Sequence, residues 1–218
     1  MKGTLIVIEG LDGSGKQTQA NLLKERLEQE GRPVKLVSFP DYAQPSSELV
    51  KLYLAGRFGT ADEVPAYIAS SFYTADRFAS YVQFWRQDYL DGKVILADRY
   101  TTSNIVHQMS KLPRAQWDGF VSWLEDFEYN KTGLPRPDRV IYLDMPPEVS
   151  KTLIMERYAG DASKKDIHEQ DFAYLMRCRE AALFAVEHYG WERVACAADG
   201  KPLGIAEIAG QIGKILKR

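Results

Sequence analysis

Seven residues near the start of the chain have the types and the spacing needed to bind a polyphosphate. Gly10, Gly15 and Lys16 fit the pattern G-x-x-x-x-G-K, between an apolar run and a helical pattern. Glycines let backbone N–H groups turn onto phosphate oxygens, and the following helix points its partial positive charge at the same anion. The lysine adds a mobile charge for the outer phosphates. We therefore expect this loop to bind ATP. The expected ATP-binding residues are Gly10, Leu11, Asp12, Gly13, Ser14, Gly15, Lys16, Gln17 and Thr18.

One position in the loop departs from the usual pattern. A serine or threonine normally follows the lysine and ligates Mg²⁺, but this chain has Gln17 there. The amide oxygen of Gln17 can reach a metal ion, or the ion can be held through water and Asp98, while Thr18 still offers a hydroxyl group to a phosphate. The departure bears on metal binding more than on phosphate binding. We expect Mg²⁺, with Asp98 as its candidate ligand.

The rest of the chain alternates short apolar runs with longer helical patterns, which is typical of a sheet with helices on both sides. Most runs are apolar throughout, as expected for strands that are covered on both faces. The predicted strands are Leu5–Glu9, Val34–Phe39, Val94–Ala97, Arg139–Leu143 and Arg193–Ala197. The predicted helices are Gln17–Glu30, Val64–Tyr89, Arg114–Tyr129, Pro147–Arg157, Asp171–Tyr189 and Ile205–Lys217. We predict an α/β fold of the P-loop type, with a five-stranded parallel sheet in a single domain of residues 1–218.

Charged residues directly follow several of these runs. Asp41 comes shortly after the second run, Asp98 and Arg99 follow the third, and Asp144 follows the fourth. Ligands of such sheets bind beyond the carboxyl ends of the strands, so we expect these residues on the same rim as the phosphate loop. Phosphoryl transfer needs cations between two repelling anions and an in-line arrangement. We therefore predict that Lys16 and Arg99 are catalytic, and that Asp98 joins them as the candidate metal ligand.

The composition narrows the class of protein. The chain has 218 residues and a net charge of −2 at pH 7, so no global positive field attracts nucleic acid or a membrane surface. No apolar stretch approaches the roughly 20 residues of a membrane span. Cys178 and Cys196 lack the spacing of a metal site and are expected to be free thiols in a reducing compartment. We expect a cytoplasmic protein with small-molecule ligands and no nucleic-acid or membrane partner.

Four segments resemble, in order, the motifs of thymidylate kinases, which transfer phosphate from ATP to dTMP. They are the phosphate loop with its flanks (Ile8–Gln19), an aromatic-x-Ala-Asp-Arg segment (Tyr73–Arg77), an Asp-Arg-Tyr segment (Asp98–Tyr100) followed by Ser103, Asn104 and Gln108, and Pro137-Asp138 leading into Tyr142–Asp144 and Pro146–Glu148. The likeness covers nearly the whole chain. It implies a P-loop kinase that uses ATP and Mg²⁺ to convert dTMP into dTDP for dTTP synthesis, and that is typically a homodimer.

The resemblance also assigns roles to residues near the expected rim. Asp12 would hold the sugar hydroxyl group, Phe39 would line the acceptor pocket, and Tyr73 would stack on the thymine ring. Arg99 would clamp the acceptor phosphate, and Asp98 would orient Arg99 and the water shell of the metal ion. Plainer alternatives stay open, because the two aromatic residues can serve only in packing, and Asp98 and Arg99 can form an ion pair at a strand end.

Three further residues are assigned to recognition of the base. Arg77 and Asn104 would hydrogen-bond the base, with Gln108 close by. From the residues alone, Arg77 can instead pair only with a carboxylate. Asn104 and Gln108 are four residues apart on a helical pattern and can bond to each other.

A lid is expected at residues 157–169. The loop Tyr158–Lys165 interrupts two helical patterns and carries Lys164 and Lys165, with Arg157 at its entrance. In this family an extra basic residue comes from the phosphate loop or from the lid, and Gly13 and Ser14 carry no charge. The resemblance therefore implies that Arg157 is catalytic, either packing on adenine or reaching the transferring phosphoryl group. A solvated basic loop is the alternative.

Two positions depart from the family. Many relatives carry an arginine shortly after the second strand, where this chain has Pro40-Asp41-Tyr42, and Arg57 is a candidate substitute. His107 stands where relatives often have a tyrosine that disfavours a ribose 2′-hydroxyl group.

Two other functions stay open. One is a P-loop kinase for another nucleotide or for a deoxynucleoside, and a hydroxyl acceptor would need a carboxylate base, for which Glu9 is the candidate. The other is a non-catalytic nucleotide-binding switch, which Gln17 favours.

Overall fold

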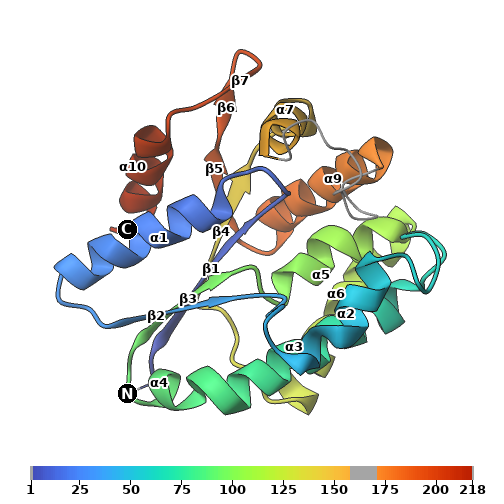
Figure 1. Cartoon of the computed structure of the whole chain (residues 1–218), viewed down its shortest axis with the longest axis horizontal. Coiled ribbons are helices and arrows are strands. Elements are labelled where there is room, and N and C mark those ends of the chain that lie inside the picture. The colour runs from blue at the N-terminus through green and yellow to red at the C-terminus, as the bar shows by residue number, and fades with distance from the viewer. Residues whose placement is uncertain (1, 158–170, 218) are drawn as a thin grey trace.

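The computed structural model, which describes residues 2–157 and 171–217, is built around a parallel sheet in the order β2-β3-β1-β4-β5 (Figure 1). The strands are β1 (Thr4–Gly10), β2 (Val34–Ser38), β3 (Val94–Asp98), β4 (Arg139–Asp144) and β5 (Glu192–Ala195). In the centre, Ile8 of β1 lies beside Asp98 of β3 and Ile141 of β4. The predicted five-stranded α/β sheet is confirmed.

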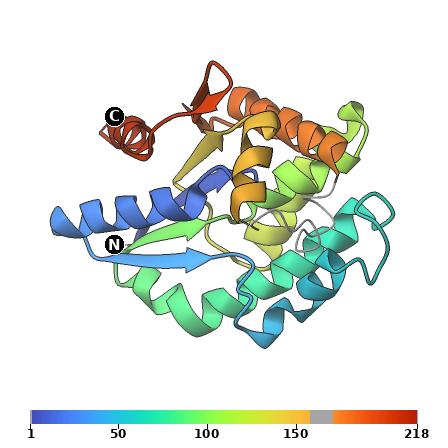
Figure 2. The ribbon, with the colours of Figure 1, turned by 45° about the horizontal axis from the view of Figure 1, so that its top comes forward.

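The central strand β1 is apolar on both of its faces. Leu5 and Val7 pack in one cluster with Trp85 and Ile95, whereas Ile6 and Ile8 belong to the cluster on the opposite face. Both faces of the sheet are therefore covered by helices, as the view in Figure 2 also shows. This two-sided burial explains why the run does not alternate with polar residues.

The helices divide between the two faces of the sheet. On one face, α1 (Lys16–Gln29), α7 (Pro147–Arg157) and α10 (Ile205–Ile215) contribute to a single apolar cluster with the strands. The opposite face carries α3 (Ala66–Ser80), α4 (Arg86–Leu90), α5 (Thr102–His107), α6 (Trp117–Glu125) and α9 (Phe172–His188). In Figure 1, α1 and α10 lie on one side of the strands, and α3, α5, α6 and α9 lie on the other.

Helix α1 follows directly from its sequence pattern. Ala20, Leu23 and Leu27 are spaced by three and four residues and are all buried. The helix ends before Gly31, whose φ of 77° is a left-handed value that a residue without a side chain adopts at little cost. Both ends of the predicted helix are confirmed to within one residue.

The segments on either side of α3 were predicted less well. No helix was predicted between Val34–Phe39 and Val64–Tyr89, but this stretch contains the short turn η1 (Pro45–Ser47) and α2 (Glu48–Leu54). Helix α2 is too short for its apolar period to stand out. The long helix predicted over Val64–Tyr89 is α3 and α4 joined by the π-turn η2 (Tyr81–Trp85).

Smaller elements complete the described parts of the chain. They are the turns η3 (Met109–Lys111) and η4 (Arg114–Gln116), the π-turn η5 (Asp126–Lys131), and a small hairpin of β6 (Ala197–Ala198) and β7 (Lys201–Pro202). No helix within residues 2–157 and 171–217 has the length and apolarity to cross a bilayer.

Candidate nucleotide site

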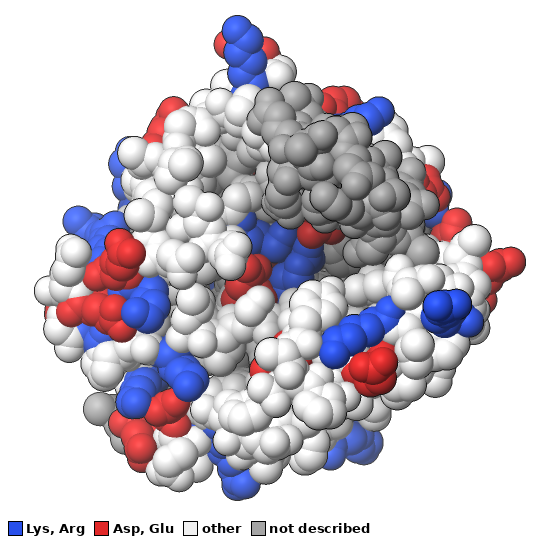
Figure 3. Space-filling view, viewed as in Figure 1, with Lys and Arg blue, Asp and Glu red and all other residues white. Residues whose placement is uncertain are grey.

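Two cavities meet at the carboxyl ends of the strands. The first, here called the loop cavity, lies along the phosphate loop and is also lined by Gln17, Thr18, Ser38 and Asp98. The second, the helix cavity, is lined by Tyr73 of α3 and by Asn104 and Gln108 of the α5 region, and measures about 510 Å³ out to its open side. Their shared wall consists of Asp12, Phe39, Pro40, Tyr42 and Arg99. Figure 3 shows acidic and basic side chains at the bottom of the corresponding hollow.

The phosphate loop has the backbone geometry that its glycines predict. Gly13 and Gly15 have φ angles of 76° and 85°, in the region that favours glycine. A Cβ atom on Gly10 would lie 2.5 Å from Oγ of Ser14, so this position requires a residue without a side chain. Helix α1 begins at Lys16 without a side-chain cap, which leaves its first N–H groups available to an anion.

Lys16 is held inside the loop. Its Nζ donates a hydrogen bond to the carbonyl oxygen of Leu11 at 2.9 Å and lies 3.9 Å from Oδ1 of Asp12. Burial, with a further contribution from the positive charge of Arg99, lowers the pKa of Lys16 to about 8. The ammonium group is therefore poorly compensated by the protein, and a bound polyphosphate would supply the missing negative charge.

Arg99 links the two cavities. Its backbone has a φ of 67°, a left-handed value that is strained for a residue with a side chain and is typical of functional positions. Its Nη2 donates to Oδ1 of Asp12 at 2.6 Å, and its Nη1 donates to Nε2 of His107 at 3.1 Å and to Oγ of Ser103 at 3.4 Å. Burial alone would lower the pKa of Arg99, but the carboxylates of Asp12 and Glu9 and that of nearby Asp98 outweigh it and raise the pKa. Arg99 is a permanent cation.

Glu9 is a buried carboxylate that connects the residues at the carboxyl ends of the strands. Its side chain is fully buried and accepts hydrogen bonds from the backbone N–H of Gly10 at 2.9 Å and from Oγ1 of Thr102 and Oγ of Ser103, both at 2.8 Å. Nη1 of Arg99 lies 3.6 Å from Oε1 of Glu9. With these four neighbours, Glu9 holds the strand end and the start of α5 together.

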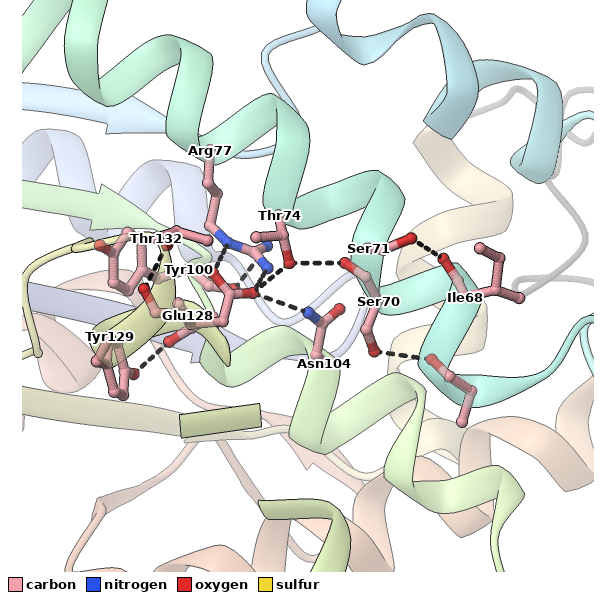
Figure 4. Close-up of polar contacts among 12 residues, drawn as sticks. Ile68, Ser70, Ser71, Thr74, Arg77, Tyr100, Asn104, Glu128, Tyr129 and Thr132 are labelled. Atoms are coloured by element: carbon pink, nitrogen blue, oxygen red, sulfur yellow. Dashed lines mark hydrogen bonds and ion pairs between the residues drawn. The ribbon is translucent and has the colours of Figure 1, made fainter. Parts of the chain in front are cut away.

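The far end of the helix cavity is organised by a carboxylate that the sequence patterns did not indicate (Figure 4). Glu128 of η5 is fully buried and forms an ion pair with Arg77. It also accepts hydrogen bonds from Oγ1 of Thr74 at 2.8 Å and from Nδ2 of Asn104 at 3.3 Å. Arg77 therefore lines the cavity and pairs with a carboxylate at the same time.

Gln108 differs from its neighbour Asn104. The two side chains do not bond to each other in the described structure; only their backbones do, from N–H of Gln108 to the carbonyl oxygen of Asn104 at 2.8 Å. Gln108 is fully buried on the cavity wall, and neither of its amide atoms has a hydrogen-bond partner within the described ranges. A buried amide of this kind costs free energy unless a ligand satisfies it.

The aromatic residues have both cavity and packing contacts. Phe39 is buried, with its ring centroid 5.8 Å from that of Tyr100, and its side chain lines both cavities. Tyr73 lines the helix cavity and meets Tyr53 edge to face, with ring centroids 6.3 Å apart. The packing alternatives are therefore real contacts, but they leave part of each ring on the cavity wall.

Most of the predicted site residues lie together. The phosphate loop, Asp98 and Arg99 surround the loop cavity, and the residues assigned to the acceptor surround the helix cavity. Arg57 is exposed and is not among the lining residues of either cavity, so nothing here favours it as a substitute arginine. Arg157 ends α7, and the expected lid over 157–169 lies outside the described residues apart from this helix end.

Glu128, Thr74 and Ser38 line or support the two cavities without having been predicted. Thr74 lies inside the matched segment Tyr73–Arg77, so its position was a usable signal. Glu128 lies in a stretch with an ordinary helical pattern and has no motif of its own. Its part in the site depends on the π-turn η5.

A parallel sheet with a glycine loop entering a helix, and a second cavity joined to it through an arginine, defines a P-loop α/β nucleotide-binding protein with room for two ligands. The family model described as thymidylate kinase matches residues 8–197. The chain belongs to the thymidylate kinase family.

Individual relatives agree with this assignment. The chain is 28% identical to a thymidylate kinase of Mycobacterium tuberculosis over 206 residues, 91% of this chain and 93% of that one. It is 29% identical to a thymidylate kinase of Danio rerio over 180 residues, 81% of this chain and 78% of the relative. The solved thymidylate kinase of Candida albicans is similar in fold, with a TM-score of 0.70, 24% identity, and coverage of 99% of this chain and 92% of that chain.

Proposed function

We propose that this chain transfers the γ-phosphoryl group of ATP to dTMP and so produces dTDP and ADP for dTTP synthesis. The observation that carries the proposal is the meeting of two cavities at Asp12 and Arg99, one along the phosphate loop and one between α3 and α5. This arrangement suits a triphosphate and a monophosphate that approach each other end to end, as in-line transfer requires.

In the proposed step, an oxygen of the dTMP phosphate forms a bond to the γ-phosphorus of ATP, and the bond between that phosphorus and the β–γ bridging oxygen breaks. The bridging electrons remain on ADP. The second pKa of a phosphate monoester is near 6, so the acceptor is already largely a dianion at pH 7 and needs no strong base. The loop amides and Lys16 would hold the donor, and Arg99 would draw the acceptor phosphate toward it by exchanging Asp12 for phosphate oxygens.

The rim fits a divalent cation. The carboxylates of Glu9, Asp12 and Asp98 outnumber the cations Lys16 and Arg99, so the described residues do not neutralise a triphosphate. Within the described ranges, the side chain of Asp98 takes part in no hydrogen bond or ion pair, although it lines the loop cavity. The same ranges hold no cluster of three or more His, Cys, Asp or Glu residues that forms a metal cage.

These observations suit Mg²⁺, which usually takes one or two protein ligands together with substrate phosphates. Asp98 would hold it directly or through water, with the amide oxygen of Gln17 and the hydroxyl group of Thr18 nearby on the same cavity wall. When bound, the ion would neutralise charge on the phosphate oxygens. Gln17 in place of serine or threonine is therefore compatible with metal-dependent phosphoryl transfer.

The roles assigned to the acceptor-binding residues remain proposals. Tyr73 would stack on the base, Phe39 would close the pocket beside it, and Asp12 would hold the sugar hydroxyl group once Arg99 turns to phosphate. Gln108 would gain from a base the hydrogen bonds that its buried amide lacks. Arg157 and a lid at 157–169 would complete the donor site.

A kinase for a hydroxyl acceptor is less well supported. Its expected base, Glu9, is fully buried, accepts three hydrogen bonds and lines neither cavity. A base must reach the proton that it removes, and Glu9 is occupied in holding the rim together.

We further propose that the chain is a homodimer in the cytoplasm. Ile68 and Phe78 of α3 and Val82 of η2 are exposed apolar side chains, with 47%, 44% and 47% of their surface accessible, and apolar surface of this kind marks many protein interfaces. Both cysteines are buried free thiols, as expected in a reducing compartment. Sedimentation equilibrium at micromolar concentration tests the dimer.

Release of ADP in the presence of a panel of monophosphates tests the function. We expect acceptor-dependent turnover with dTMP that requires added Mg²⁺. Turnover with thymidine but not with dTMP would favour a nucleoside kinase. Binding of ATP without any acceptor-dependent turnover would favour a switch.

A further inference from the structure

The buried carboxylate of Glu128 restricts what the helix cavity can recognise. One of its oxygens, Oε1, accepts hydrogen bonds from Thr74 at 2.8 Å and from Nδ2 of Asn104 at 3.3 Å, and it also pairs with Arg77. Figure 4 shows these three side chains converging on Glu128 from α3 and α5. Both partners of the ion pair are almost completely removed from water, with 1% and 0% of their side chains exposed.

The carboxylate determines the orientation of the Asn104 amide. An ionised carboxylate has only acceptor atoms, so the NH₂ group of Asn104 must be the end that faces Glu128. The amide oxygen is then the end available to the helix cavity, which Asn104 lines. Gln108 offers a contrast, because its amide has no partner among the described residues and can present either end.

Arg77 is restricted in the same way. Its Nε donates to Oε2 of Glu128 at 3.3 Å, its Nη2 pairs with Oε1, and its Nη1 lies 3.5 Å from the carbonyl oxygen of Tyr100. A guanidinium group has donors only. The far wall of the helix cavity therefore presents a fixed donor from Arg77 and a fixed acceptor from Asn104.

We infer that Glu128 is a positioning residue that sets the cavity to read an imide edge, and this inference rests on the proposed function. Thymine and uracil offer a C4 carbonyl oxygen, which accepts, next to an N3–H group, which donates. Cytosine offers the reverse, an amino group at C4 and an acceptor at N3. The first pattern complements Arg77 and Asn104 as Glu128 holds them. The second places two donors and two acceptors against each other.

The π-turn η5 explains how Glu128 reaches this position. Residues Asp126–Lys131 continue α6 with a wider turn, and the backbone carbonyl of Glu128 accepts from N–H of Leu134 at 3.1 Å. Single π-turns in helices are frequent at functional sites. The side chain is buried here although its neighbours Asp126 and Asn130 bond to each other at the surface.

The unmodified chain provides the first test, with dTMP, dUMP and dCMP compared at saturating ATP and Mg²⁺. A site built for hydrogen bonds rejects a mismatched partner strongly, so kcat/KM for dCMP should lie at least about 100-fold below that for dTMP. dUMP keeps the imide edge and should lose only the smaller contribution of the methyl group, about 10- to 100-fold. A value for dCMP within threefold of dTMP would overturn the inference.

Two variants test Glu128 itself. Glu128→Asp keeps the charge for the long Arg77 side chain but withdraws the carboxylate from Asn104. Glu128→Met removes the acceptor that holds the Asn104 amide, so that either end of this amide can face the cavity. In both we expect the preference for dTMP over dCMP to fall about tenfold or more, through a higher KM for dTMP and a lower KM for dCMP. The ratio of dTMP to dUMP should stay within about twofold, because both share the same edge.

Tyr129→Phe is the matched control, because it removes a hydroxyl group from the same π-turn, at its contact with Thr101, and leaves the Glu128 contacts in place. It should keep the wild-type preference. An equal loss in Tyr129→Phe, or an unchanged dTMP to dCMP ratio in a folded Glu128 variant, would overturn the inference.

The outcomes separate the two proposals. Absence of turnover with dTMP in the unmodified chain contradicts the proposed function. Turnover with dTMP and equal turnover with dCMP contradicts only the role of Glu128. If both Glu128 variants fail to fold, the comparison of dTMP, dUMP and dCMP in the unmodified chain decides.

Discussion

Two arginine–carboxylate pairs lie beside the helix cavity and differ in their access to water. Arg77 and Glu128 are 1% and 0% exposed, whereas Arg99 and Asp12 are 14% and 25% exposed. Arg77 and Glu128, here called the closed pair, are surrounded by protein. Arg99 and Asp12, here called the open pair, lie on the shared wall of both cavities, where a ligand can replace one partner.

The difference in exposure predicts different roles: the buried Arg77–Glu128 pair positions side chains, and the partly exposed Arg99–Asp12 pair can exchange a partner for a ligand. Breaking a closed pair leaves a charge without water or partner, so the pair keeps one arrangement. An open pair can trade a carboxylate for a phosphate, because the arginine fork binds both with similar geometry. We therefore expect the closed pair to control fold and selectivity, and the open pair to control turnover.

The largest effect should come from Arg99→Met at the open pair. The loss of a cation that contacts the transferring or accepting phosphate should lower kcat/KM for dTMP by about 10³-fold. The free energy of unfolding should fall by less than about 2 kcal/mol, because Asp12 is partly solvated and Glu9 keeps three hydrogen bonds. The measurements are coupled ADP release and urea unfolding.

Lys24→Met, at an exposed pair with Glu28, is the control and should change neither value appreciably. A larger loss of stability than of turnover in Arg99→Met would remove the distinction between the two pairs.

Arg77→Met tests the closed pair, for which we expect a large loss of stability. It leaves the Glu128 carboxylate buried without its counter-charge, which should lower the free energy of unfolding by about 3–5 kcal/mol. The double variant Arg77→Met with Glu128→Leu removes both charges and should recover part of that loss, because an apolar replacement of a buried pair is often neutral. Urea unfolding monitored by circular dichroism provides the values. Wild-type stability in Arg77→Met would show that this pair is not a structural element.

The smallest of the three effects concerns pH. The pKa of Lys16 is lowered to about 8, so its charge is present at pH 7 and is lost as pH rises through 8. We expect KM for ATP to rise about tenfold between pH 8 and pH 9.5 as the ammonium group loses its proton. The folded protein penalises the charged form, so the same deprotonation should increase stability over that range, opposite to its effect on ATP binding.

Lys16→Arg keeps its charge and should show a flat profile for KM over this range. Lys111, whose pKa burial also lowers to about 8, bonds Tyr53 and the carbonyl oxygen of Val64. Lys111→Met should therefore retain the wild-type profile. If the pH dependence of KM disappeared in Lys111→Met, the effect would belong to Lys111 and the prediction for Lys16 would be wrong.

Much of the fold could be predicted from local patterns. The glycines of the phosphate loop, the apolar run before it, and the spacing of Ala20, Leu23 and Leu27 each constrain a few neighbouring residues. Helix α1 was therefore predicted to within one residue at each end. Helix α2 and the π-turns η2 and η5 were missed. They are short or irregular, and a period of 3.6 residues does not reveal them.

The candidate site was only partly predictable. The order of the motifs indicated which residues belong to the rim, but not which of them pair. Arg99 lies 87 residues from Asp12 and 8 residues from His107, and its open pair depends on how β1, β3 and α5 are stacked. The lid and the roles of the acceptor-binding residues stay predictions.

By itself, the sequence determined the phosphate loop, the alternation of strands and helices, and the family to which the chain belongs, because these depend on residues close together or on motifs in order. Only the tertiary structure decided that Glu128 holds Thr74, Arg77 and Asn104, which lie 54, 51 and 24 residues away. Burial of a carboxylate costs free energy unless several hydrogen-bond donors compensate it, and these donors come together only after the chain has folded.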